Sequence, residues 1–344
     1  MQLGERLRLT LFGTSHGPRV GALLEGVPKG LRVDETAIAQ AMATRRPGGR
    51  YASKRKEQDC VEFLSGIVEG KTTGASIELS IENQDAKSKD YNFLPHHPRP
   101  GHQDMVMHKR TKGEADLRGG GMSSARLTAP LVAAAAFVAP LLAPLGIKAE
   151  AQVGAIGNVE AGEMEHQPAR WSTEACKEMR CRDPDAAEAM VNLVESQRMN
   201  LNSIGSRVDL IVTGTPLGLG EPWFDGIEPA MARAMMSIPA ARGVTFGRGF
   251  NVVNMTGLEH NDAWGGSPES PTPLGERPDG VLAGLATSAP IRCSVAFKPP
   301  SSIASEQKTL HLESGAIEPL TVKGRHDPVL GPRAVAVVEA MAIL

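Results

Sequence analysis

One long stretch without any charged side chain constrains the fold more than any other feature of the chain. From Leu127 to Ile147 there is no Asp, Glu, Lys or Arg, and Ala and Leu dominate. Apolar residues recur at helical spacing from Leu127 to Leu142, which predicts a helix there. The stretch is long enough to span a bilayer. Three prolines interrupt it, however, and a polar glycine loop precedes it, so we expect a buried core helix and no membrane insertion.

The segment that leads into this helix, Arg118 to Arg126, has the sequence RGGGMSSAR. Three consecutive glycines let the backbone turn sharply and approach a ligand closely. Ser123 and Ser124 are good N-cap residues. A glycine loop at a helix N-terminus offers unpaired N–H groups to an anion, and the two arginines add fixed charge. These features predict a phosphate-binding loop; an ordinary loop capped by serine is the alternative.

The overall composition excludes several classes of protein. The 344 residues are 41% hydrophobic and only 4% aromatic, which indicates a globular protein with an aliphatic core. The net charge of −2 argues against a general nucleic-acid binder, and local arginine clusters suit a small anionic ligand better. The four cysteines form no C-x-x-C pair and the first residues lack a signal-peptide apolar region. We therefore expect reduced thiols and a cytoplasmic protein.

Strand and helix patterns are mixed along the chain, which predicts an α+β fold. Strands are expected at 7–12, 20–27, 61–68, 75–81, 147–160, 207–213, 243–253 and 291–297, followed by two short ones. Helices are expected at 34–43, 127–142, 172–198 and 228–237 and at the C-terminus. Residues 92–116 read as helix-poor, and residues 260–280 as a mobile loop. Because no composition break divides the chain, we expect one domain over residues 1–344, with two sheet layers and outer helices.

The two halves of the chain resemble each other in outline. Each has strands, a polar loop with paired serines and a long apolar helix. Ser123 and Ser124 in the first half correspond to Ser301 and Ser302 in the second. This similarity predicts an internal pseudo-repeat.

Two segments in the first third of the chain carry candidate functional groups. His16 lies in the turn GTSHG between two predicted strands, where it would be exposed to an adjacent cleft and could donate a proton near neutral pH. An ordinary surface histidine is the alternative. Arg45, Arg46 and Arg50 lie in the glycine-rich segment TRRPGGR. Their planar donor groups could bind phosphate or carboxylates, or they could form a solvated face.

A third candidate segment is HHPRPGHQD, residues 96–104. Its prolines and glycine should hold Arg99 and His102 on a rigid loop. His96, His97, His102 and Asp104 could instead form the metal site of a metal-dependent phosphatase. No pair among them has the i, i+4 spacing of a zinc-binding helix, and the prolines argue against such a helix. We therefore expect no metal.

Taken together, these segments resemble the chorismate synthase family. The shared motifs occur in the family's order and cover essentially the whole chain: GTSHGPRV at 13–20 with EGVP at 25–28, RRPG at 45–48, RPGHQD at 99–104, GGGMSSAR at 119–126, KPPSSI at 298–303 and RHDP at 325–328. Any one of these motifs would be weak, but the ordered set is specific.

The resemblance implies a reaction and an architecture. The family converts 5-enolpyruvylshikimate 3-phosphate to chorismate and phosphate by a 1,4-elimination, the last common step of the shikimate pathway to aromatic amino acids. The reaction requires reduced FMN without net redox change. The implied fold is a β-α-β sandwich with antiparallel sheets in the core and helices outside, assembled as a homotetramer. Whether NADPH acts directly or an external flavin reductase is needed stays open.

The resemblance also implies roles for individual residues. His16 matches the histidine that stabilises the departing phosphate, His102 the one that protonates or neutralises the reduced flavin near N1, and Asp327 the aspartate that assists proton transfer to flavin N5. The implied anion contacts are Arg45, Arg46, Arg50, Arg99 and Arg126. Which of the first three contacts substrate and which a nicotinamide donor stays open. The implied FMN contacts are Met122, Ser123, Ser124, Pro239, Ala240, Ala283, Lys298, Pro299, Pro300, Ser301, Ser302 and Arg325.

Overall fold

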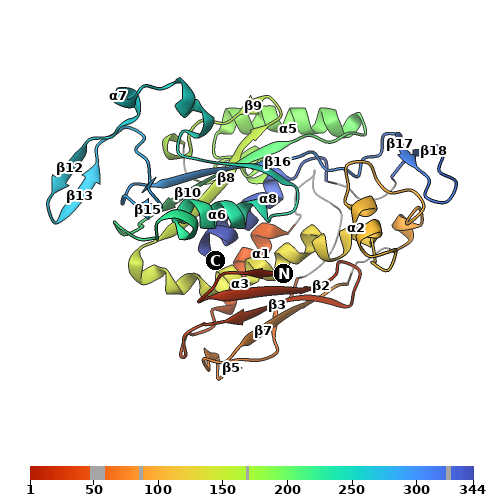
Figure 1. Ribbon diagram of the computed structural model, residues 1–344, viewed down its shortest axis with the longest axis horizontal. Helices are drawn as coiled ribbons and strands as arrows, with labels where there is room; N and C mark the ends of the chain where they lie inside the picture. The colour runs from red at the N-terminus through yellow and green to blue at the C-terminus, as the bar shows by residue number, and fades with distance from the viewer. Residues whose placement is uncertain (47–58, 85–87, 168–169, 323–326) are drawn as a thin grey trace.

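The computed structural model describes residues 1–46, 59–84, 88–167, 170–322 and 327–344. Figure 1 shows the chain as two antiparallel sheets, one below and one above a group of helices. The α+β class expected from the sequence is therefore confirmed.

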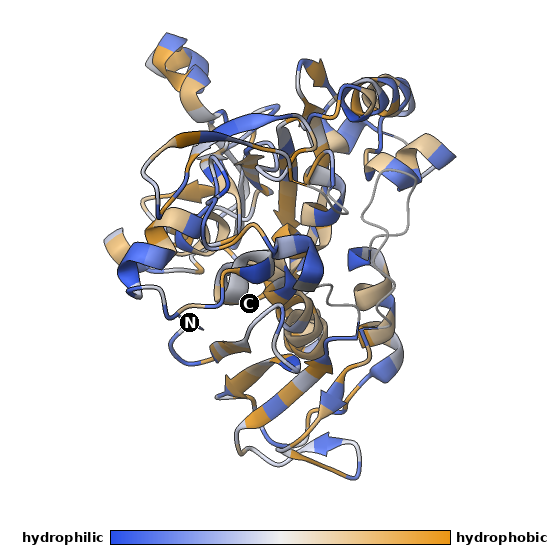
Figure 2. Ribbon diagram, turned by 90° about the vertical axis from the view of Figure 1, so that its right-hand side faces the viewer, coloured by the Kyte–Doolittle hydropathy of each residue, from blue (hydrophilic) through white to orange (hydrophobic). Residues whose placement is uncertain are grey.

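The first sheet comes from the N-terminal quarter of the chain. Its strand order is β1 (Gln2–Leu3), β2 (Arg8–Gly13), β3 (Arg19–Glu25), β7 (Ile77–Glu82) and β4 (Glu62–Phe63), all antiparallel. The central strands β3 and β7 are buried along most of their length, whereas β2 is mostly half-buried. Apolar residues of this sheet lie toward the helices (Figure 2). The expected strand 61–68 is divided: its second part, β5 (Ile67–Val68), forms a small hairpin with β6 (Lys71–Thr72).

The second sheet comes from residues 148–297. Its order is β11 (Ala241–Phe246), β16 (Ile291–Phe297), β10 (Ser206–Thr213), β8 (Lys148–Ile156) and β9 (Val159–Glu160), again antiparallel. Every second residue of β10 is buried, which confirms the strand expected there. The strand expected at 243–253 ends at Phe246, and a 3₁₀ segment, Gly249–Asn254, follows it.

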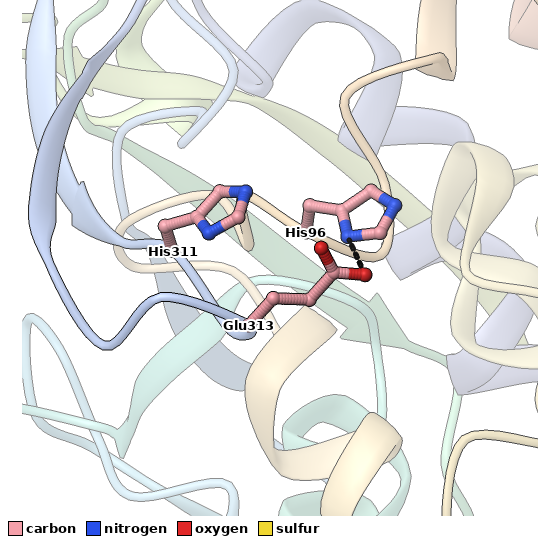
Figure 3. Close-up of side chains that lie close together, drawn as sticks. All are labelled: His96, His311 and Glu313. Carbon is pink, nitrogen blue, oxygen red and sulfur yellow. Dashed lines mark ion pairs between the residues drawn. The ribbon is translucent and has the colours of Figure 1, made fainter.

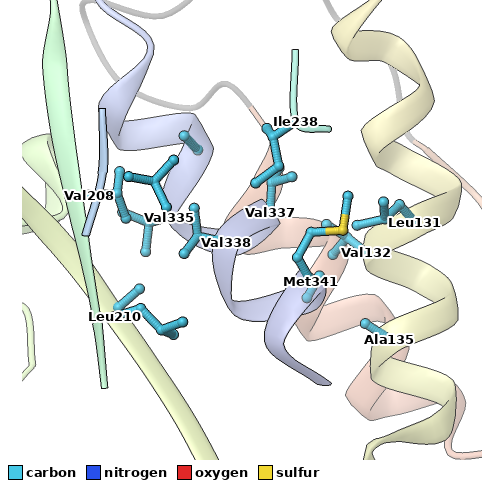
Figure 4. Packing of buried hydrophobic residues seen from close by; sticks show 14 of the residues in the cluster. Leu131, Val132, Ala135, Val208, Leu210, Ile238, Val335, Val337, Val338 and Met341 are labelled. Carbon is cyan, nitrogen blue, oxygen red and sulfur yellow. The ribbon is translucent and has the colours of Figure 1, made fainter. Parts of the chain in front are cut away.

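Three helices lie between the two sheets: α1 (Glu35–Arg45), α3 (Thr128–Val138) and α8 (Gly331–Ile343). Helix α3 packs on β3 and β7, α8 packs on β8 and β10, and the three helices contact one another. In Figure 4, Val335 and Val338 of α8 lie toward β10, and Met341 lies between α8 and α3. The expectation that sheets form the core and helices lie outside is therefore wrong for these helices. The physical reason is that α3 is apolar all round, and all its residues except Ala136 are buried.

The helical stretch Arg118–Leu141 is long and apolar enough to cross a membrane. However, 61% of its apolar 18-residue segment is buried inside the protein. It packs in the central layer, against helices and strands of both halves of the chain. This is the packing of a core helix, as the sequence predicts.

The other helices differ from the ranges expected from the sequence to varying degrees. The helix expected at 172–198 is two helices, α4 (Glu174–Met179) and α5 (Pro184–Met199). It breaks because Arg180 adopts a left-handed conformation with φ of 54° and Asp183 caps a new helix. Helix α6 (Ile227–Met236) is close to its expected position. Residues 92–116, which were expected to be helix-poor, contain helix α2 (Asp104–Arg110).

The segment expected to be a loop at 260–280 is also partly ordered. It follows α7 (Gly257–His260) and contains a hairpin of β12 (Trp264–Ser267) and β13 (Ser270–Pro273). Two further hairpins complete the description: β14 (Val281–Leu282) with β15 (Leu285–Ala286), and β17 (Gln307–Leu310) with β18 (Ile317–Leu320).

Candidate active site

The triple-glycine loop lies between the two predicted catalytic histidines. Gly119, Gly120 and Gly121 have φ values of 59°, 89° and 54°, a region that side chains other than glycine rarely adopt. A Cβ atom added to Gly119 would lie 3.0 Å from Nε2 of His16, and one added to Gly120 would lie 3.8 Å from Nε2 of His102. The loop thus brings together two imidazoles from segments that are far apart in the sequence.

His16 is positioned by the turn between β2 and β3, which docks directly onto this loop. The backbone N–H of Ser15 donates to the carbonyl of Gly121 at 3.2 Å, and its hydroxyl donates to the carbonyl of Arg118 at 3.0 Å. The His16 ring also meets the ring of Tyr91 edge-on, with centroids 5.1 Å apart. These contacts hold the imidazole at the glycine loop.

His102 is held by a buried ion pair. Asp104 is fully buried, and its carboxylate lies 2.6 Å from Nδ1 of His102 while accepting hydrogen bonds from Nε and Nη2 of Arg99 at 2.7 and 2.9 Å. Burial raises the pKa of Asp104, but the hydrogen bonds from Arg99 and His102 outweigh burial and keep that pKa well below its usual range. Asp104 is therefore ionised, and it binds Nδ1 of His102 while Nε2 faces Gly120.

The segment 298–302 docks onto the loop that carries Arg99 and His102. Lys298 Nζ and Ser301 Oγ both donate to the carbonyl of Gly101, the serine at 2.8 Å, and Ser302 Oγ accepts from Arg99 at 3.0 Å. The backbone N–H of Lys298 donates to the carbonyl of Ala240 at 3.0 Å. The predicted flavin contacts at 239–240 and 298–302 therefore adjoin the loop that carries His102.

A largely apolar cavity of about 320 Å³ lies beside the glycine loop. Four of the predicted flavin contacts line it, namely Met122, Ser123, Ser124 and Pro239. The rest of the wall comes from Met1, Gln2, Leu3, Leu9, Leu11, Leu127, Thr128, Leu131, Arg233, Ser237, Val337 and Met341. The volume and the mixture of apolar walls with a few polar groups are typical of small-molecule sites.

Asp59 joins two of the predicted anion-binding arginines. Its carboxylate accepts a hydrogen bond from Arg45 Nη1 at 3.0 Å and pairs with Arg126, and all three side chains are buried. Arg45 also donates to Thr128 at 3.1 Å. Asp59 thus links the two guanidinium groups behind the loop. Asp59 cannot be identified from the sequence, since no local pattern connects it to Arg126.

The remaining predicted residues lie as follows. Arg46 is the C-cap residue of α1. Asp327 accepts a hydrogen bond from Arg333 Nη1 at 2.6 Å. Ala283 lies in the β14–β15 turn with φ of 51°. The carbonyl of Pro300 accepts a hydrogen bond from the hydroxyl of Ser203. Pro299 lies near Gly205, while Arg50 and Arg325 lie outside the described residues.

The alternative metal site is wrong as proposed. Asp104 and His102 bind Arg99 and each other, as described above. In the described part of the chain, His96 and His97 instead group with His311 and two glutamates. The four residues His96, His97, His102 and Asp104 therefore do not form one metal-ligand set, and a phosphatase built on them is not supported.

Comparisons with known proteins identify the family of the chain. The family model for chorismate synthase matches residues 7–344. A curated chorismate synthase of Aeropyrum pernix is 46% identical over 99% of this chain and 90% of its own length, and one of Methanosarcina mazei is 40% identical over 99% and 93%. A crystal structure of chorismate synthase superposes with a TM-score of 0.74 at 27% identity, covering 98% of this chain and 90% of that one. With a family model and full-length relatives in agreement, the chain belongs to the chorismate synthase family.

Proposed function

We propose that the protein is a carbon–oxygen lyase that converts 5-enolpyruvylshikimate 3-phosphate to chorismate and phosphate, at the last common step of the shikimate pathway. Membership of the family over residues 7–344 supports this reaction. The structural observation that carries it is the glycine loop held between His16 and His102. A 1,4-elimination of phosphate needs a group that stabilises the departing phosphate and a nearby group that takes part in transfer of the ring proton.

The positive charge around the loop suits a substrate with one phosphate and two carboxylates. Arg45 and Arg126 lie behind the loop and share Asp59. Arg99 lies behind His102, where it pairs with Asp104. We assign these three arginines, with Arg46 and Arg50, to anion binding. A protonated His16 would stabilise the negative charge that develops on the departing phosphate and hold a proton at Nε2.

The residues beside the loop fit a flavin. The cavity has apolar walls for a flat ring system, with the hydroxyls of Ser123 and Ser124 at its edge. We propose that these serines, Met122 and the segment 298–302 hold FMN, with further contacts from Pro239, Ala240, Ala283 and Arg325. When bound, reduced FMN supplies the electron density that helps phosphate leave. His102, oriented by Asp104, would hold a proton at Nε2, and Asp327 would assist proton movement.

An anaerobic assay tests this function. Purified protein with dithionite-reduced FMN should form chorismate and release phosphate from the enolpyruvyl substrate, whereas oxidised FMN or no FMN should give no turnover. A parallel reaction with NADPH and oxidised FMN decides whether the chain reduces its own flavin or needs an external reductase. Full activity without reduced flavin would contradict the proposal.

A glycine substitution tests the loop itself. Gly119→Ala should lower turnover by roughly 100-fold, because its Cβ would lie 2.7 Å from Ser15 Oγ and displace His16. Gly70→Ala is the matched control. Gly70 has φ of 70°, so alanine meets a similar backbone cost of about 1–2 kcal/mol, but no atom lies within 4 Å of the added Cβ. Gly119→Ala should lose more stability than Gly70→Ala in thermal melts because of this clash, and turnover is compared at a temperature where both are folded. Equal turnover would refute the role of the loop.

We further propose a homotetramer. Several large apolar side chains that are strongly exposed in the single chain come from residues 217–285, among them Phe224 (88% exposed) and Leu258 (96% exposed). Exposed apolar surface of this kind is typical of a subunit interface. Light scattering in solution tests the assembly, and a monomer at micromolar concentration would exclude it.

We also propose a single cytoplasmic domain over residues 1–344 with an internal duplication. For the duplication, residues 2–82 and residues 148–297 each form a five-stranded antiparallel sheet that packs against a core helix, α3 for the first and α8 for the second. Helix α3 directly follows Ser123 and Ser124, whereas the β17–β18 hairpin lies between Ser302 and α8. Limited proteolysis that releases two stable halves would contradict the single domain. A superposition of the halves that fails to align α3 with α8 would contradict the duplication.

A further inference from the structure

Three histidines and two glutamates meet on the side of the protein where the β17–β18 hairpin covers the segment before Arg99. Figure 3 shows His311 and Glu313, from the hairpin turn, beside His96. The rings of His96 and His311 are nearly parallel with centroids 5.7 Å apart, and the ring of His97 lies 4.7 Å from that of His311. The turn therefore gathers imidazoles from segments that are distant in sequence.

The ligand atoms of this cluster have the spacing that a metal ion needs. Those of His97, His311 and Glu318 all lie within 4.8 Å of one another, and the same holds for His96, His311 and Glu313. Zinc takes nitrogen and oxygen ligands at about 2.0–2.2 Å in tetrahedral geometry, so the ligand atoms of one ion lie about 3.3–3.6 Å apart. Small side-chain adjustments bring either group to that distance. Because both groups use His311, they bind one ion at a time.

We propose that His97, His311 and Glu318 bind one transition-metal ion such as Zn²⁺. Imidazole and carboxylate ligands suit zinc better than calcium or magnesium. This group is preferred over the other because its side chains are less exposed: 21% for His97 and 38% for Glu318, against 43% for His96 and 71% for Glu313. His97 Nε2 already lies 2.8 Å from Glu318 Oε2, so an ion can take the place of the proton between them, with the proton of the neutral ring then held at Nδ1.

The surroundings hold the ligands in place. The backbone N–H of Ser314 donates to Nδ1 of His311 at 3.1 Å, and the Ser314 hydroxyl lies 3.0 Å from the same atom. With an ion on Nε2 the ring proton would move to Nδ1, where this hydroxyl can accept it in place of the backbone contact. The backbone N–H of Leu312 donates to the carbonyl of His96 at 2.9 Å. A bound ion would therefore cross-link the hairpin to the segment that leads to Arg99, independently of the proposed reaction.

Titration of the full chain with metal ions tests the site. Protein freed of metal by chelator should bind one Co²⁺ per chain, with visible absorption bands that show nitrogen and oxygen ligation, and Zn²⁺ should displace it. His311→Ala and Glu318→Gln should each weaken binding by at least about 10-fold. Glu313→Gln, the same change on the same turn, should alter affinity less than about 2-fold, and His166→Ala serves as a remote histidine control. Circular dichroism verifies that each variant is folded.

Two results would overturn the assignment. Equal affinity of the native protein, His311→Ala and Glu318→Gln would show that the cluster is not the site. Weaker binding in Glu313→Gln but not in Glu318→Gln would exclude this set of ligands. Because neither measurement uses turnover, failure of the metal site is distinguishable from failure of the proposed enzymatic function.

Discussion

Replacing His102 by alanine is expected to lower turnover by about 10²- to 10⁴-fold, the usual contribution of a positioned acid or base. Nε2 of His102 faces Gly120 in the loop, and Nδ1 is bound by the buried carboxylate of Asp104. The ring itself is only partly buried, so its removal opens no cavity in the core. The expected change is therefore a loss of kcat in the anaerobic assay with reduced FMN, without loss of folded protein.

The control for this variant is His166→Ala, since His166 is strongly exposed on another part of the surface. It should keep full turnover. If His102→Ala retains the activity of this control while FMN is saturating, the imidazole at the glycine loop takes no part in the chemistry. If activity is lost together with the far-ultraviolet circular dichroism signal, the effect is structural, and the site loses its principal support.

Asp59→Asn is expected to lower the free energy of unfolding by about 3–5 kcal/mol, because it leaves two buried guanidinium groups without their shared counter-charge. Arg45 and Arg126 both bind this carboxylate, and each of the three side chains is at most 5% exposed. Asparagine retains the shape of the side chain and tolerates the φ of 52° at this position, so the substitution changes mainly the charge. Denaturant unfolding followed by circular dichroism measures the effect.

A surface ion pair provides the comparison. Arg19 pairs with Glu62 at 2.7 Å, but both side chains are substantially exposed. Glu62→Gln should therefore cost less than about 1 kcal/mol. Similar losses for Asp59→Asn and Glu62→Gln would mean that the buried cluster is well solvated, and that its charge does not contribute to anion binding as proposed.

The strands and helices were largely predictable because their periodicity is local. Alternation along β10 and helical spacing along α3 are properties of a few consecutive residues. The order of the layers was not predicted correctly, although the sequence contained the relevant signal. A helix without charge on any side, such as α3, must be covered on all sides, which indicates a place between two sheets. The β12–β13 hairpin was missed because its glycines, serines and prolines show no alternating pattern.

The candidate site shows the same division between local and distant contacts. His16, Arg99 and His102 could be proposed from the sequence because each lies in a short loop shaped by glycine or proline. The pairing of Asp104 with Arg99 and His102 is also local, but the sequence analysis considered Asp104 only as a metal ligand. Asp59 could not be found, since its partner Arg126 lies 67 residues away and only the folded chain brings them together.

The scarcity of aromatic side chains in the helical layer determines which spectroscopic signals can report on this protein. Of its three tryptophans, Trp171 packs against the buried core cluster, whereas Trp223 and Trp264 are 81% and 51% exposed. Intrinsic fluorescence will therefore report on loosening of the core mainly through Trp171. Trp223 belongs to the exposed apolar set of residues 217–285, so a blue shift of its emission with rising protein concentration would report subunit association without any added dye.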